Sequence, residues 1–313
     1  MADGSRHSLY AVKEDTYNVT PTDPALELVR ITGTTLGLAK DTLESQEIRS
    51  DRQIAEMRMG ANRVAGDINF ELSYTTFDTL LEAVLMSAPW EVDTPVAGTD
   101  QIKCGQTRNS FTFVRNFADL ATKSYFVYTG CEINQMTLSI PANNMITGTF
   151  SVVGASQTIV NDLSAMGTPT FPPATTTAAL DSFTGNLNEN GTTIAVITEI
   201  QLTLNNNIEP RYVVGQKNSI RNSVGRSNLT GQITAYFEDA SLVEKFINEV
   251  ESDIDFQLPD PDGNVQKHRL PRIKYTGGQP DVTSEGPITL TLPFQALLDP
   301  ATGTNYLIER TPA

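Results

Sequence analysis

Alternating apolar and polar positions predict β-strands at several places along the chain. Apolar residues occupy every second position in the segments 68–72, 136–140, 200–204 and 233–237, with mostly polar residues between them. Successive side chains on a strand point to opposite faces, so such a strand buries one face and leaves the other in water. The pattern therefore favours antiparallel sheets that are wet on one side.

Two stretches with helical spacing each follow one of these strands. Apolar residues recur at i, i+4 and then i+7 or i+8 within 77–85 and within 242–250. This spacing places them on one face of a helix. We expect Thr75 or Thr76 to cap the first helix and Asp239 the second, because short polar side chains accept hydrogen bonds from the free N–H groups of a first turn. One amphipathic helix would then cover the apolar face of each sheet.

The order of these elements repeats, which indicates an internal duplication. One half contains "ITGTTLGL" from Ile31 and a longer block from Gly60, and the other contains "ITEIQLTL" from Ile197 and a similar block from Gly225. The interval is 29 residues in the first half (31 to 60) and 28 in the second (197 to 225). Each block also has a second glycine six residues after its first. Two further blocks follow in the same order, with Tyr128 matched to Tyr275 and Ile146 to Ile288.

These patterns predict a mainly β (α+β) fold. We expect two tandem antiparallel β-sandwich or barrel modules, each with one packed amphipathic helix, at 31–160 and 191–300. The segment 161–190 is rich in Thr and Pro and is expected to be a linker. The segments 1–30 and 301–313 lack a clear period and are expected to form arms.

The acidic composition limits the classes of partner. A net charge of -15 argues against a protein that grips nucleic acid by its phosphates, and it suits either simple solubility or a surface along which DNA slides without sticking. No apolar run reaches the ~20 residues of a membrane span, and we expect no signal peptide and synthesis in the cytoplasm. Cys104 and Cys131 do not form a CxxC pair, so we expect two small buried thiols and no disulfide.

The sequence offers no catalytic, cofactor or metal site. The two histidines, His7 and His268, are far apart in sequence, and there is no HExxH, GxSxG or GxxxxGK[ST] pattern. "DPDGN" at 260–264 is similar to a calcium loop but lacks the closing Glu, so we interpret it as a hairpin turn. We therefore expect a protein that is not an enzyme.

Two long connections interrupt the modules, at Ala39–Gln53 and Asn205–Ser223. Loops of about 15 residues are uncommon in a compact domain unless they bind something. The first carries charges of both signs that could form ion pairs between molecules, although solvated loop charges would look the same. These candidates are Lys40, Asp41, Glu44, Glu47, Arg49, Asp51 and Arg52.

The residues of both halves resemble those of the major tail tube proteins of siphophages, in a form with two modules. The resemblance rests on "LESQEIRSDRQIAEMRMGANRVAGDINFELSY" with "FDTLLEAVL", on "NSFTFVRNF", on "YFVYTGCEINQMTLSIPANNMITGTFSVVG" and on "GRSNLTGQITAYFED". It implies sandwich-like modules whose sheets join into a β-barrel around a lumen, in rings that are usually six-fold. Two modules per chain then imply a ring of three chains, or alternatively six chains with the second module outside.

The unpaired backbone groups at the edges of these sheets also favour assembly into rings. Half-wet sheets leave unpaired N–H and C=O groups on their edge strands, and closure into a ring removes those edges. A head-to-tail contact along the ring axis never closes, so rings stack into a filament. We expect the loops at 39–53 and 205–223 to make that axial contact. Candidate residues for the lumen wall are the acids Asp67, Glu71, Asp253 and Asp255, although each could equally lie on the outer surface.

The resemblance also implies partners and a place. The partners would be further copies of the chain, the tape measure protein inside the tube, the terminator and the distal tail or baseplate proteins at its ends, and double-stranded DNA in transit without specific binding. The place would be the virion, with assembly in the host cytoplasm. The alternatives are another tail ring component (distal tail, baseplate hub or terminator) and, from a different class, a carbohydrate-binding β-module.

Overall fold

The computed structural model describes residues 3–182, 185–193, 196–280, 282 and 285–313. Strands dominate, and the described residues include two short α-helices, α1 (Asp78–Leu85) and α2 (Ser241–Ile247). The predicted mainly β fold with flanking helices is therefore confirmed. Neither helix is long and apolar enough to cross a membrane, within the part of the chain that is described.

The strands of the first half are β1 (His7–Glu14), β2 (Glu27–Val29), β3 (Gly33–Thr34), β4 (Gly37–Glu44), β5 (Met57–Glu71), β6 (Asp100–Lys103), β7 (Ser110–Phe117), β8 (Tyr125–Pro141), β9 (Thr147–Gly154) and β10 (Ser156–Val160). Those of the second half are β11 (Asn186–Glu189), β12 (Thr192–Thr193), β13 (Ile197–Asn205), β14 (Glu209–Arg211), β15 (Ile220–Ser223), β16 (Asn228–Tyr236), β17 (Glu251–Pro259), β18 (Val265–Tyr275), β19 (Thr289–Ala296) and β20 (Leu307–Thr311). Single 3-10 turns lie at Gly4–Arg6 and Ser164–Met166.

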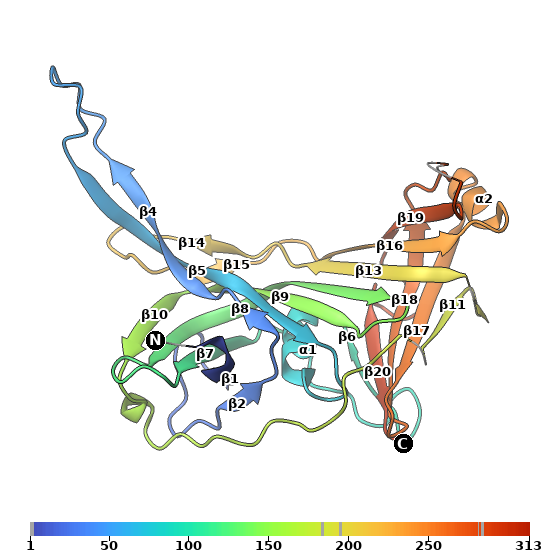
Figure 1. The fold of residues 1–313 in the computed structure, drawn as a ribbon, viewed down its shortest axis with the longest axis horizontal. Coiled ribbons are helices and arrows are strands. Elements are labelled where there is room, and N and C mark those ends of the chain that lie inside the picture. Colours follow the sequence, from blue (N-terminus) through green and yellow to red (C-terminus); the bar gives the residue numbers. More distant parts are fainter. Residues whose placement is uncertain (1–2, 183–184, 194–195, 281, 283–284) are drawn as a thin grey trace.

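One hydrogen-bonded sheet passes through both halves. Its central order is β4–β5–β9–β8–β13–β16–β19–β18, and every neighbouring pair in it is antiparallel. The halves meet where β8 pairs with β13, with Leu138 opposite Leu202, and Figure 1 shows these strands side by side at the middle of the molecule. We call β3–β5, α1, β8 and β9 the first module, and β13, β16, α2, β18 and β19 the second module.

The strand ladders repeat from one module to the other in the same register. Leu38 faces Val64 as Leu204 faces Leu229. Ile68 faces Phe150 as Ile233 faces Leu292. The opening strands therefore correspond at an offset of 166 (204 − 38) and the second strands at 165 (233 − 68), as the matched sequence blocks predict.

One of the matched blocks was aligned wrongly from the sequence. Tyr275 faces Phe294 on β19, and the first module's counterpart of Phe294 is Val152, which faces Ile133. Tyr275 therefore corresponds to Ile133, five residues beyond Tyr128. The two tyrosines match in sequence because each begins a "YTG" triplet, but they lie at different distances from the next strand. From Ile133 to Ile146 and from Tyr275 to Ile288 that spacing is 13 residues in each module (146 − 133 and 288 − 275).

The repeated glycines Gly66 and Gly231 lie where two strands cross at close range. A Cβ on Gly66 would lie 2.4 Å from the Cα of Leu36, and one on Gly231 would lie 2.5 Å from both the Gln201 carbonyl oxygen and the Phe294 ring. No side chain fits at such distances. The six-residue glycine spacing in the sequence thus marks a shared backbone feature of the two modules.

Both predicted helices form, but not with the predicted caps. Phe77, Leu81, Val84 and Leu85 are buried in the core as predicted. The first helix has Phe77 at its N-cap with no side-chain cap, because the Thr76 hydroxyl is engaged with Ser73 and the 175–177 segment. In the second helix Asp239 accepts a hydrogen bond from the Ser241 N–H at 2.8 Å, one residue before the N-cap, and α2 ends before the exposed Val250.

The terminal segments are strands in this structure, contrary to the expectation of arms at 1–30 and 301–313. Strand β1 pairs with β7 along its whole length and buries Leu9 and Ala11. Strand β20 pairs with β18 and with β6 from the first half. Each segment contains a short apolar run, at 9–12 and at 306–308, that becomes buried wholly or in part when the strand joins the sheet. Residues 161–182 run along the first half, with a bridge between Ala25 and Thr170 (Figure 1), whereas β11 pairs with β17 of the second half.

Candidate functional site

A polar face crosses from one module to the other. Residues that face each other in neighbouring strands share a face of the sheet, so rows of side chains can be followed through the ladder. One row reads Asn69, Thr149, Thr137, Thr203, Thr230 and Gln295, and the next reads Glu71, Thr147, Ser139, Gln201 and Gln232. From β5 to β19 these rows contain no basic side chain, and the first row then continues to Lys274 on β18, which faces Gln295. The opposite face of the same strands forms the apolar core.

Hydrogen bonds between neighbouring side chains hold this face together. The Ser151 hydroxyl donates to Asp67 at 2.7 Å and the Thr149 hydroxyl to Asn69 at 2.9 Å. The Ser139 hydroxyl on β8 donates to Glu199 on β13 at 3.3 Å, across the joint between modules. Side chains that satisfy one another in this way present a smooth neutral to acidic surface, which suits weak contact with a polyanion.

The structure separates the four predicted lumen acids into two pairs. Asp67 and Glu71 lie on the polar face. Asp253 and Asp255 lie on β17, which pairs with β18 and β11 beyond the end of that face. Asp255 is only 9% exposed and its carboxylate is 2.6 Å from the Lys267 ammonium, so it is a neutralised internal charge. The sequence reasoning missed Glu199, although its place in the alternation of "ITEIQLTL" could have identified it.

The first long loop forms a hairpin that extends away from the body. It consists of the outer halves of β4 and β5, and Figure 1 shows it reaching well beyond every other element. The hairpin exposes several large apolar side chains, namely Leu43, Ile48, Ile54, Met57 and Met59. Exposed apolar clusters of this kind mark contact surfaces.

The predicted loop charges are only partly paired in the single chain. The Arg49 guanidinium lies 2.8 Å from the Asp51 carboxylate, and this hydrogen-bonded contact lowers the pKa of Asp51. Arg49 also lies 3.9 Å from Glu47, and Asp41 lies 2.9 Å from Arg63 on the facing strand. Among the residues that the structure describes, no ion pair involves Lys40, Glu44 or Arg52.

The second long loop has a different environment, because it lies on the first module. Its strands β14 and β15 form a separate two-stranded sheet. The Asn62 N–H on β5 donates to the Lys217 carbonyl at 2.8 Å, and the Tyr212 hydroxyl donates to the Asn62 carbonyl at 2.9 Å. The buried Asn206 amide donates to the Val84 carbonyl at the end of α1 at 2.8 Å. This loop is therefore engaged within the chain.

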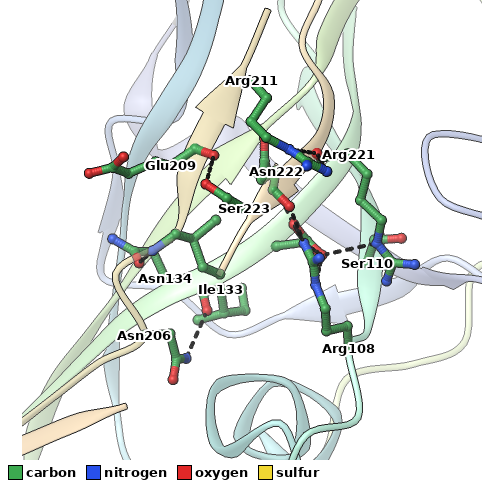
Figure 2. A network of polar contacts seen from close by, with 12 residues as sticks. Arg108, Ser110, Ile133, Asn134, Asn206, Glu209, Arg211, Arg221, Asn222 and Ser223 are labelled. Carbon is green, nitrogen blue, oxygen red and sulfur yellow. Dashed lines mark hydrogen bonds and ion pairs between the residues drawn. The ribbon is translucent and has the colours of Figure 1, made fainter. Parts of the chain in front are cut away.

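A buried ion pair anchors that contact. The Arg108 guanidinium donates to both carboxylate oxygens of Glu132 at 2.7 Å, and the Glu132 side chain is 3% exposed. Arg108 also donates to the Asn222 carbonyl at 2.9 Å, and the Asn222 amide donates back to Glu132 at 3.1 Å. Arg221 lies 3.8 Å from the same carboxylate. Figure 2 shows Arg108 directed toward Asn222 on the second half, so this network joins the two halves.

A second polar junction lies at the C-terminal strand. The Arg310 guanidinium on β20 pairs with Asp78 and, at 3.0 Å, with Asp100, and it stacks over the Trp90 ring at 4.3 Å. Three elements of the first half thus hold the last strand of the chain. This contact gives Trp90 a structural role.

Several other titratable groups are buried or hydrogen-bonded within the fold. The ring of His268 is fully buried between Phe256 and Tyr306, and burial lowers its pKa to about 3. The carboxylate of Asp260 accepts the N–H groups of Asp262 and Asn264 in the hairpin turn between β17 and β18, as predicted for this segment. Within the described ranges, no group of three or more His, Cys, Asp or Glu side chains is placed to hold a metal ion. Cys104 and Cys131 are free thiols, and burial raises the pKa of Cys104 to about 12.

Comparison with known proteins agrees with this architecture. A search of curated proteins gives no match. The model of the phage tail tube protein family matches residues 4–296, which is nearly the whole chain and includes both modules. The protein therefore belongs to the phage tail tube protein family.

Proposed function

We propose that three copies of this tail tube subunit close into a ring of six modules, and that rings stack into a tube. Family membership supports assembly into a tube, a structural role in the virion and contact with other tail proteins. The observation that carries the three-chain ring is the β8–β13 ladder. Each chain already contains one junction between consecutive modules, and three chains need only repeat that junction.

Strands β4 and β19 lie where the junctions between chains would form. Strand β4 pairs with β5 on one side, and the described residues supply no strand on its other side. Strand β19 pairs with β16 along its length and with β18 at 294–296, and on the β18 side the Thr276 N–H also donates to the Pro293 carbonyl at 2.8 Å. Its counterpart β9 is paired with β8 over seven residue positions, from Glu132 to Ser139 with one bulge. The edge of β4, which has no further strand beside it in the described part of the chain, favours lateral addition of further copies.

The polar face is the proposed lumen wall, with Asp67, Glu71 and Glu199 as its acids. Its rows run from β5 to β19 without a basic side chain, and Lys274 on β18 lies only at the far end of the first row, so closure of the ring would line most of the channel with neutral and acidic groups. DNA moves easily along such a wall because phosphate contacts need Lys or Arg. The tape measure protein would occupy the same channel before DNA passes, and the wall would take part in no catalysis.

The tip of the β4–β5 hairpin is the proposed contact between stacked rings. Its charges of both signs and the fully exposed Ile48 give it the means to bind a neighbour. Deletion of Thr42–Asp51 should leave the chain folded and the rings intact but prevent tubes. Tubes that still form would remove this tip from the axial contact. The terminator and the distal tail proteins would bind the two ends of the stack, and assembly would take place in the host cytoplasm.

Electron microscopy of the purified protein tests the proposal. Long hollow tubes should appear at high protein concentration, and mass per unit length divided by the ring repeat should give three chains per ring. A value of six would indicate that the second module lies outside the ring. Isolated rings that never stack would favour a hub or distal tail component instead.

A further inference from the structure

The two long hairpins are copies of one element. Leu43 faces Arg58 in the first hairpin, and Glu209 faces Ser223 in the second. The offsets between these pairs are 166 (209 − 43) and 165 (223 − 58), the same offsets that relate the two modules elsewhere. The second hairpin therefore shows where a hairpin of this kind lies when its partner module is present. The first hairpin has no such partner within the chain.

The surface of the first module on which the second hairpin lies has an equivalent surface on the second module. On the first module the hairpin covers the ion pair Arg108–Glu132. Glu132 faces Val153 on β9, and its counterpart Lys274 faces Gln295 on β19. Lys274 also forms an ion pair, with Glu249, whose nearest atoms lie 3.2 Å apart. The second module thus has an ion pair at the same place with the two charges exchanged.

The two ion pairs differ in exposure. The Glu132 side chain is 3% exposed because Asn222 and Arg221 lie over it. The Lys274 and Glu249 side chains are 37% and 79% exposed. Nothing among the described residues covers Lys274 as the second hairpin covers Glu132. The second module thus lacks the cover that the first module has.

The charges on the two hairpins are exchanged as well. Arg221 lies above Glu132 in the second hairpin. The same position in the first hairpin is Glu56 (221 − 165), an exposed acid just before β5 whose carboxylate lies 3.6 Å from the also exposed Arg58 guanidinium. In the first module the surface residue is acidic (Glu132) and the hairpin residue is basic (Arg221). At the equivalent positions the surface residue of the second module is basic (Lys274) and the residue of the first hairpin is acidic (Glu56). A reversal on both surfaces preserves attraction between them, as expected for surfaces that meet.

We propose that, in the ring, the β4–β5 hairpin of each chain lies on the second module of the neighbouring chain, with Glu56 paired to Lys274. The inference rests on the proposed ring and adds which surfaces meet. The exposed Met57, whose counterpart Asn222 is completely buried, becomes covered in this contact. The base of the hairpin then joins chains within a ring, and its tip remains free for the next ring.

Charge reversal tests this pairing. Glu56→Lys and Lys274→Glu should each slow or prevent tube formation while leaving the isolated chain folded, and the two together should restore tubes. Glu238→Lys and Lys123→Glu make the same charge changes at exposed positions elsewhere and should have no effect. Wild-type-like tubes from both single variants would overturn the inference and leave the tube function intact. A wild-type chain that forms neither rings nor tubes would instead refute the proposed function.

Crosslinking gives an independent readout. Cysteines at Glu56→Cys and Lys274→Cys, joined by a short thiol-reactive linker in assembled tubes, should give a product series that ends at three chains. Wild-type protein is the control, because Cys131 is completely buried and Cys104 is partly buried, and any product through these native thiols would also appear there. A series that continues beyond a closed ring would place the contact between rings, and absence of products in intact tubes would also refute it. A series ending at six would keep the lateral contact but replace the three-chain ring.

Discussion

Replacement of Arg108 by Ala removes the cation that neutralises a buried carboxylate at the contact between the two halves. Glu132 would keep the Asn222 amide at 3.1 Å and the more distant Arg221 at 3.8 Å, but it would lose every hydrogen bond from a guanidinium. The Asn222 carbonyl would lose its donor at the same time. The variant therefore leaves an acid inside the protein without adequate compensation.

The magnitude follows from the burial of Glu132. Removal of one partner of a buried ion pair typically costs 3–5 kcal/mol, because the remaining charge stays desolvated. Arg108 is itself 23% exposed and Arg221 supplies some residual attraction, so the lower end of that range applies. We expect the free energy of unfolding of the isolated chain to fall by about 3 kcal/mol.

Urea unfolding of the dilute, unassembled chain measures this change. Trp90 is the only tryptophan and stacks against Arg310, so its fluorescence reports on the junction of the two halves. Arg272→Ala is a matched control, because Arg272 makes two hydrogen bonds to Glu251 in an exposed pair. Exposed pairs contribute about 0–1 kcal/mol, so the control should unfold almost like the wild type.

A second variant separates charge burial from general disruption. Arg108→Met combined with Glu132→Leu removes both charges and should recover most of the lost stability, since buried pairs can be replaced by apolar residues at little cost. The reasoning is refuted if Arg108→Ala unfolds within about 1 kcal/mol of the wild type. It is also refuted if the double variant is less stable than the single one.

Three further outcomes can be checked on the same protein. Gly231→Ala should lower the free energy of unfolding by about 1–3 kcal/mol through overpacking against Gln201 and Phe294, and Gly4→Ala, which has nothing within 4 Å, should not. His268 stays neutral in the folded chain down to a pH of about 3 but is protonated below its ordinary pKa of 6.5 when unfolded. Stability should therefore fall as pH decreases from 6.5, by up to about 1.4 kcal/mol per pH unit, and less steeply in His268→Gln. Tubes of Asp67→Lys should retain DNA fragments at low salt and release them at high salt, whereas wild-type tubes should retain none.

Much of the fold could be predicted from the sequence because alternation and helical spacing are local signals. Ile68 and Ile233 lie in the core at the predicted strands, and the helices begin near the predicted stripes. Those signals say which face of a strand is buried. They do not say which strand lies beside it, so the joint between β8 and β13 was visible only in the structure.

The candidate lumen residues could likewise be predicted from the alternation within a strand but not from the pairing between strands. Asp67 and Glu71 could be placed on a wet face by alternation, and the structure puts them on the shared polar face. Asp255 occupies an equally clear polar position in its strand, but Lys267 on the facing strand neutralises it. The alternation within one strand does not predict which residues of another strand face it. The buried Glu132 gave no sequence signal, because its partners lie 24 and 90 residues away.

The arrangement of the two modules in the assembled tube is the point on which the account most depends. An electron cryomicroscopy reconstruction of the tubes measures it directly. We predict six similar modules around the lumen from three chains, with the β8–β13 ladder alternating with contacts between chains and with Asp67 and Glu199 facing inward. A ring of six first modules, with the second modules outside and no part of β13 beside the lumen, would contradict the account.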